Sequence, residues 1–89
     1  MDQIQVIDNN VAKLNITIAG ENGDLPDPVD FDAGDATIKA WATEAIRGGS
    51  VPGIAAREAD FTDFVVDRIA AKDGLPPRLM LRPKTEYGQ

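Results

Sequence analysis

The sequence has no cysteine and no histidine, and only five of its 89 residues are aromatic. Without cysteine it can form neither a disulfide nor a thiolate metal site, and without histidine it lacks the commonest general base and metal ligand. No nucleophile, base and metal ligands are grouped in a way that suggests catalysis. We therefore expect a protein that is not an enzyme and that holds no metal or cofactor.

Long apolar runs are also absent, and the start "MDQIQVIDNN" does not have the pattern of a secretory leader. Fifteen acidic and nine basic residues give a net charge of −6. This charge disfavours nucleic acid and anionic membranes as partners. We expect a cytoplasmic monomer, with twelve acids and four bases in residues 1–63 but three acids and five bases in residues 64–89.

The first half of the sequence contains the clearest strand signal. Ile4 and Val6 alternate with a polar residue, Asn9-Asn10 suits a turn, and apolar residues then alternate with polar ones from residue 12 to residue 18. This pattern predicts a β-hairpin with one buried face. The segment that follows, "ENGDLPDPVDFDAGD", has six acids and no base, and we interpret it as an acidic loop that leads into a helix.

The stretch "DATIKAWATEAIRGG" has the strongest helical pattern in the chain. Its apolar residues fall at helical spacing and form one face: Ile38, Trp41, Ala42, Ala45 and Ile46. Asp35 is the expected N-cap and Gly48 the expected left-handed residue after the helix. Trp41 lies in the middle of the apolar stripe, so we predict that it anchors the core.

The last third of the sequence contains one ambiguous segment and one clear strand. Residues 60–72 fit a helical period, yet "FVV" at 64–66 is typical of strands. We predict that residues 63–69 form a strand, because a hairpin plus one terminal strand is a thin sheet to support a helix. Leu79 and Leu81 then point one way and Arg78, Met80 and Arg82 the other in a closing strand, which Pro83 should end.

Three stretches resemble ubiquitin-like proteins. "IQVIDNNVAKLNITI" resembles the opening hairpin of ubiquitin, "GDATIKAWATEAIRGGSVPG" its helix and exit, and "RLMLRPKTEYG" its last strand and basic tail. The resemblance implies an α+β fold of the β-grasp type, in which an N-terminal hairpin packs on one central helix and a C-terminal strand joins the sheet. Residues 1–82 are the expected domain and residues 83–89 a flexible tail.

The resemblance also implies a function like that of bacterial ubiquitin-like modifiers. Gly88 matches the glycine whose carboxylate is adenylated by an activating enzyme, passed to a cysteine as a thioester and joined to a target amine. A peptidase, such as a metallopeptidase, would first remove Gln89, and a conjugating enzyme could take part in the transfer. Arg82 and Lys84 stand at the family's basic tail positions, and Tyr87 lies beside the reacting glycine.

Two other functions stay open. A sulfur carrier of the same fold would use the same Gly88 carboxylate. A non-conjugated module, such as an accessory protein of phage defence or of a mobile element, would instead dock a basic partner on the acidic surface around residues 21–35. The modifier and the sulfur carrier both require a reaction at the tail, whereas the docking module does not.

Overall fold

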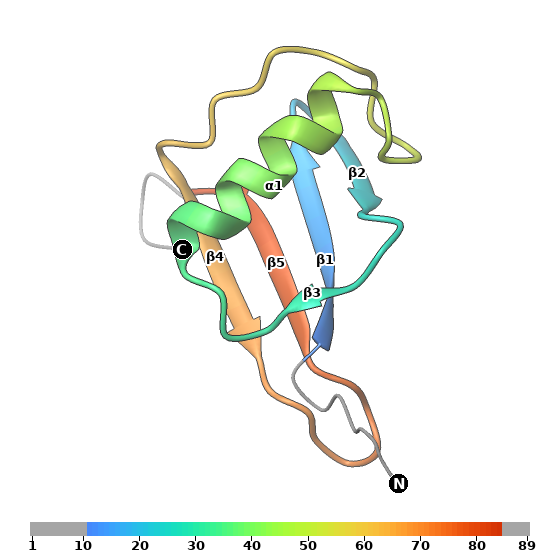
Figure 1. Cartoon of the computed structure of the whole chain (residues 1–89), viewed down its shortest axis with the longest axis vertical. Coiled ribbons are helices and arrows are strands. Elements are labelled where there is room, and N and C mark those ends of the chain that lie inside the picture. Colours follow the sequence, from blue (N-terminus) through green and yellow to red (C-terminus); the bar gives the residue numbers. More distant parts are fainter. Residues whose placement is uncertain (1–10, 85–89) are drawn as a thin grey trace, which may run out of the picture.

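The computed structural model describes residues 11–84, which form one helix and a mixed five-stranded sheet (Figure 1). The helix, α1, crosses one face of the sheet, and a long connection leads from its end back to the sheet (Figure 1). In chain order the elements are β1 (Val11–Ile18), β2 (Glu21–Asp24), β3 (Val29–Asp30), α1 (Asp35–Arg47), β4 (Phe64–Ile69) and β5 (Arg78–Pro83).

The strands lie in the order β2-β1-β5-β4, and the short β3 pairs with the start of β1. β1 and β5 run parallel, with Leu14 opposite Leu79 and Ile16 opposite Leu81, whereas the other pairs are antiparallel. The first and last described strands are therefore neighbours at the centre of the sheet. The expected α+β class, the single helix and the terminal strand that joins the sheet are confirmed, and the arrangement is compatible with the expected β-grasp order.

The predicted strand at residues 12–18 is confirmed as β1, whose even-numbered residues are buried. Its expected partner at Ile4 to Val6, with the turn at Asn9-Asn10, lies outside the described residues. The hairpin that the structure does describe joins β1 to β2 through Ala19 and Gly20, whose φ angles are 51° and 80°. Two consecutive positive φ angles match the twist of a two-residue hairpin turn.

The interpretation of residues 21–35 as a loop is wrong where β2 and β3 form. β2 lacks the apolar alternation by which a half-buried strand is recognised. Its pairing with β1 relies on polar side chains as well as on the backbone. Asn15 Nδ2 donates to Asn22 Oδ1 at 3.1 Å and to Asp24 Oδ1 at 2.8 Å, and Asn22 Nδ2 donates to Thr17 Oγ1 at 2.8 Å. Such cross-strand polar pairs stabilise an edge strand without burying it.

Helix α1 forms in the predicted stretch, but both of its predicted caps are wrong by one residue. Gly34 takes the N-cap position with no side-chain cap, and Asp35 lies in the first turn, where it pairs with Arg68 at 2.5 Å. At the other end Gly48 has a φ of −81°, and the left-handed residue is Gly49, with a φ of 71°. Asp35 is thus used for an ion pair to β4 rather than for capping.

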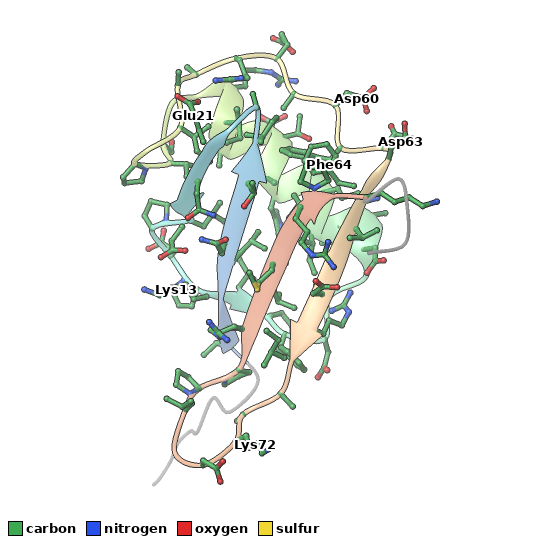
Figure 2. The ribbon with its side chains drawn as sticks, turned by 180° about the vertical axis from the view of Figure 1, so that it is seen from behind. Lys13, Glu21, Asp60, Asp63, Phe64 and Lys72 are labelled. Carbon is green, nitrogen blue, oxygen red and sulfur yellow. The ribbon has the colours of Figure 1, made fainter. Side chains whose placement is uncertain are left out.

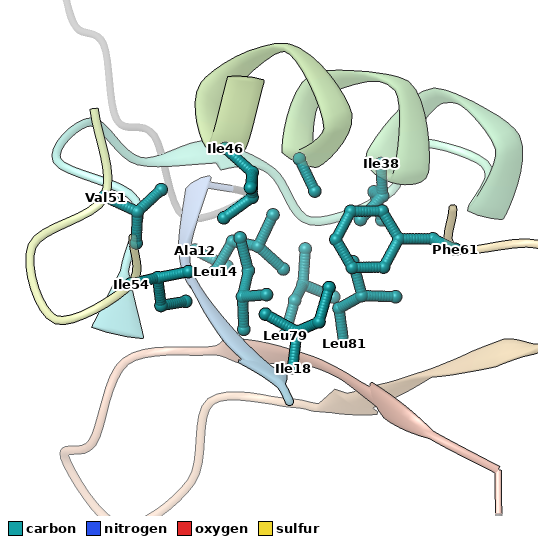
Figure 3. Packing of buried hydrophobic residues seen from close by; sticks show 12 residues of the cluster. Ala12, Leu14, Ile18, Ile38, Ile46, Val51, Ile54, Phe61, Leu79 and Leu81 are labelled. Atoms are coloured by element: carbon teal, nitrogen blue, oxygen red, sulfur yellow. The ribbon is translucent and has the colours of Figure 1, made fainter. Parts of the chain in front are cut away.

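The core lies between α1 and the sheet and includes residues from the connection after the helix (Figure 3). Trp41 is 39% exposed, so the prediction that it anchors the core is wrong. The helix buries only the narrow stripe of Ile38, Ala42 and Ile46, which leaves Trp41 on its flank. The buried residues are Ala12, Leu14, Ile16, Ile18, Ile38, Ala42, Ile46, Val51, Ile54, Phe61, Leu79 and Leu81.

The predicted strand at residues 63–69 is confirmed as β4, except that Asp63 belongs to the preceding turn. Pairing with β5 overrides the helical period of this segment, and it places Phe64 and Val66 against the core. The ring of Phe64 meets that of Phe61 edge to face, with centroids 4.8 Å apart. This contact fixes the point at which the connection enters the sheet.

Two glycines allow the connection after α1 to approach β2 closely. A Cβ at Gly23 would lie 2.1 Å from the carbonyl oxygen of Pro52, and one at Gly53 would lie 2.6 Å from that of Asn22. Gly53 also has a φ of 92°, which favours glycine. The two backbones can touch only because neither residue has a side chain.

Ile16→Asp is expected to abolish folding, whereas Trp41→Gln is expected to preserve a cooperative transition. Ile16 is fully buried, and an unpaired carboxylate there costs several kcal/mol, about the whole stability of a small domain. The glutamine side chain that replaces Trp41 would keep its amide in water. Thermal unfolding followed by circular dichroism tests both variants, and a cooperative transition for Ile16→Asp near the wild-type temperature would contradict the core assignment.

Gly23→Ala is expected to lower the free energy of unfolding by about 1–3 kcal/mol, because its new methyl group meets a backbone oxygen that cannot turn away. Gly48→Ala is the matched control: its φ of −81° suits any residue and a Cβ there meets its nearest atom at 3.5 Å, an ordinary contact, so we expect a change of about 0.5 kcal/mol or less. Urea unfolding measures both. Equal losses in the two variants would contradict the close approach.

Candidate functional site

The first candidate site is the β5 exit, which we define as Arg82, Pro83 and Lys84. Leu81 is the last residue of β5 that pairs with β1, and the strand continues along β4 with Arg82 opposite Val65 and Pro83 opposite Phe64. Proline has no N–H to donate to a further ladder bond, which accounts for the end of the strand at Pro83. Arg82 and Pro83 of the β5 exit are thus held in the sheet by β4 alone.

The five predicted site residues fall into two groups. Arg82 belongs to β5, and Lys84 follows the strand and is exposed. The other three, Tyr87, Gly88 and Gln89, lie outside the described residues. The structure therefore places the two basic residues at the β5 exit.

Arg82 is held by an acidic residue of the neighbouring strand. Its Nε lies 2.5 Å from Asp67 Oδ2, and both side chains are about two-fifths exposed, at 40% and 42%. The pair lies on the sheet face opposite α1, because Leu81 and Val66, which alternate with these residues, point toward the helix. Half of the charge that the sequence assigned to a basic tail is thus compensated within the sheet.

Within residues 11–84, no helix or strand covers this open sheet face (Figure 2). Lys13, Arg78 and Met80 border one hollow on it together with the asparagines and aspartate that join β1 to β2. Ile69 is 37% exposed at the end of β4. The face is mixed, with basic, amide and apolar groups side by side.

The second candidate site lies beside α1; the sequence indicated the acidic surface around residues 21–35, but not that Trp41 borders it. It is a hollow between the helix and the chain from β2 to β3, and we call it the Trp41 hollow. Its lining residues are Leu25, Asp27, Pro28, Val29, Asp30, Trp41, Glu44, Ala45 and Ser50. The sequence signal for this site was the acidic run at residues 21–35; the exposure of Trp41 follows only from the structure, in which the helix buries Ile38, Ala42 and Ile46.

The described residues contain no group of three or more side chains that could hold a metal ion. The hydroxyl of Thr62 donates to Asp60 Oδ1 at 2.6 Å and its backbone N–H does so at 2.9 Å, which lowers the pKa of that exposed carboxyl. A carboxylate held ionised in this way is a poor proton donor at neutral pH. Asp60 thus serves the turn before β4.

In the part of the chain that the structure describes, none of the helices has the length and apolarity required to cross a bilayer.

No known protein family, curated protein or solved structure matches this chain significantly.

Removing the Arg82 pair is expected to change stability little. Arg82→Ala and Asp67→Ala should each lower the free energy of unfolding by about 1 kcal/mol or less, because exposed ion pairs are weak. Lys84→Ala is the control for removal of a basic residue outside the strand. Urea unfolding measures all three, and a loss above about 2 kcal/mol for Arg82→Ala would mean that the pair holds the β5 exit in place.

Proposed function

We propose that this chain is a ubiquitin-like protein of the β-grasp fold and acts as a protein modifier through the carboxylate of Gly88. The observation that supports this proposal most is the parallel pairing of β1 with β5 at the centre of the sheet, under one helix. This is the arrangement that the β-grasp order of elements requires. The α+β class alone would not distinguish it from other small folds.

The position of the β5 exit is suited to presenting a reactive segment. β5 is paired on both sides until Leu81, so the base of the segment is fixed to the most buried part of the sheet. From Lys84 to Gly88 the chain can span at most about 17 Å when extended, at about 3.4 Å per residue. That reach lets the reacting residue enter an enzyme while the folded domain stays outside.

The chemistry needs only a carboxylate without steric hindrance. After hydrolysis of the bond between Gly88 and Gln89, the Gly88 carboxylate attacks the α-phosphate of ATP, and pyrophosphate leaves. A cysteine thiolate of the activating enzyme then displaces AMP and forms a thioester, from which a target amine releases the thiol and gains an amide bond. Glycine has no side chain beside the carbonyl carbon attacked in these steps.

The basic residues of the β5 exit would assist the encounter with the activating enzyme. Lys84 is exposed, and Arg82 is only partly compensated by Asp67. Opposite charge on the partner raises the association rate more than the affinity. The proposed partners are an adenylating activating enzyme, a peptidase that removes Gln89 and, where one exists, a conjugating enzyme.

The test uses three forms of the protein with ATP and an adenylating enzyme of the class that activates ubiquitin-like proteins. A form that ends at Gly88 is expected to load and to gain a thioester-linked mass. The same form with Gly88→Val should load at least about tenfold more slowly, because a branched side chain crowds the carbonyl. The full-length chain should load only after a peptidase has removed Gln89.

Gly34→Ala in the form that ends at Gly88 is the control for loss of a glycine elsewhere, and it should load normally. The proposal is wrong if the form that ends at Gly88 stays unmodified, or if no peptidase removes Gln89. A module that binds a basic partner without being conjugated would then be the better interpretation.

A further inference from the structure

The Trp41 hollow combines an apolar floor with an acidic rim. Leu25, Val29 and Ala45 are partly buried and pack against the core, and the exposed part of the Trp41 ring lies beside them. A tryptophan left 39% exposed in the middle of a helix keeps a large apolar surface in water. Exposed aromatic surface with a polar rim is typical of sites that bind other proteins.

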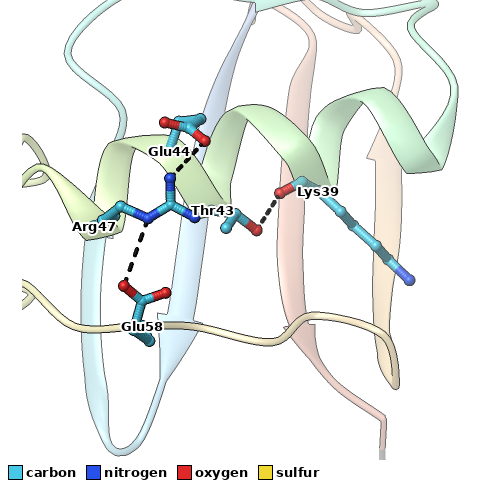
Figure 4. A network of polar contacts seen from close by, with 5 residues as sticks. All are labelled: Lys39, Thr43, Glu44, Arg47 and Glu58. Carbon is cyan, nitrogen blue, oxygen red and sulfur yellow. Dashed lines mark hydrogen bonds and ion pairs between the residues drawn. The ribbon is translucent and has the colours of Figure 1, made fainter.

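The charge on the rim is of one sign. Asp27, Asp30 and Glu44 line the hollow, and the lining residues include no lysine or arginine. Glu44 is compensated in part, because its Oε2 lies 2.9 Å from Arg47 Nη1, and Arg47 also approaches Glu58 at 3.6 Å (Figure 4).

The two aspartates of the rim are not compensated by a cation of the described chain. Asp30 Oδ1 accepts a hydrogen bond from the backbone N–H of Asp32 at 2.9 Å. Within residues 11–84, neither Asp27 nor Asp30 forms an ion pair. Two other acids of the same segment are paired, since Glu21 meets Arg57 and Asp35 meets Arg68, each at 2.5 Å, whereas Asp24 and Asp32 form no ion pair within the described residues. The rim of the hollow therefore carries two acids that no described cation compensates.

We propose that the Trp41 hollow binds a basic segment of a partner protein, with a lysine or arginine over the Trp41 ring and an adjacent apolar side chain against Leu25 and Val29. A cation over an indole face is attracted by the ring, and its aliphatic stem covers apolar surface at the same time. Asp27 and Asp30 then lie close to the cationic group. An anionic partner is disfavoured by the same two carboxylates.

Two other occupants fit the hollow less well. A divalent cation alone has too few ligands, because the described residues contain no cluster of three or more metal-ligating side chains. A second copy of this chain could present Lys13, Lys39, Lys72, Arg78 or Lys84, because its other four basic residues are engaged in ion pairs within residues 11–84, but two copies that each carry a net charge of −6 repel one another. The inference does not rest on the proposed function, since it involves neither Gly88 nor the β5 exit.

The only tryptophan of the chain reports directly on this site. The probe is a short capped peptide in which lysine alternates with leucine, added to the full-length protein while Trp41 emission is recorded. A saturable change of intensity or wavelength is expected. A peptide with glutamate in place of lysine should give no saturable change, and one with serine in place of leucine should bind more weakly.

Two pairs of substitutions separate the hollow from the net charge. Asp27→Asn with Asp30→Asn should weaken binding about tenfold, because two carboxylates that face the cation lose their charge. Asp63→Asn with Asp73→Asn makes the same change of net charge at two exposed turns away from the hollow, and should change the dissociation constant by about twofold or less. Asparagine tolerates the φ of 53° at position 73.

The proposal is wrong if the lysine and leucine peptide causes no saturable change of Trp41 emission. It is also wrong if the two pairs of substitutions weaken peptide binding equally, or if the glutamate peptide binds as tightly as the lysine peptide. Sedimentation of the protein alone is the last measurement. Self-association that Asp27→Asn with Asp30→Asn abolishes would assign the hollow to a second copy of the chain instead.

Discussion

The fold depends on the parallel contact between β1 and β5. These strands lie more than sixty residues apart in the sequence, yet Leu14 pairs with Leu79 and Ile16 with Leu81, and all four side chains are fully buried. A parallel pair needs a crossover connection, which here consists of everything from β2 to β4. The helix covers the pair, and the connection after it supplies Val51, Ile54 and Phe61 to the same core. The core therefore forms only when β1 and β5, the strands that the crossover joins, are paired.

The connection from residue 48 to residue 63 has little regular structure, and it is held at both ends. At the start Gly23 and Gly53 let its backbone touch β2, and Arg57 pairs with Glu21 at the end of the first hairpin turn. At the finish the edge-to-face contact of Phe61 with Phe64 leads it into β4. These contacts explain how a chain with one helix of 13 residues closes a core of twelve buried side chains. A loop of this length is stable here because its apolar residues fill the part of the core that a second helix would otherwise fill.

The sequence predicted those parts of the fold in which local pattern and tertiary environment agree. The alternation in β1 and β5 and the place of α1 follow from periodicity, because each of these elements buries one face. β2 could not be found in this way, since its pairing depends on Asn22 and Asp24 meeting side chains of β1. The N-cap of α1 was misplaced because Asp35 is used by Arg68, a residue of β4 that only the tertiary structure brings near. Trp41 was misplaced because periodicity does not show how wide a stripe the sheet can cover.

The two candidate sites differ in charge and lie on different layers of the molecule. The Trp41 hollow is on the helix side and is acidic, whereas the β5 exit continues from the centre of the sheet and carries Arg82 and Lys84. The uneven charge along the sequence thus becomes an uneven charge in space, because the acidic segment wraps beside α1 while the basic one forms the last strand. A basic partner bound at the Trp41 hollow and a second partner that receives the β5 exit in an acidic groove would not compete for the same surface. The acidic hollow repels an acidic partner, and the basic β5 exit repels a basic one. A net charge of −6 is therefore compatible with two different partners bound at the same time.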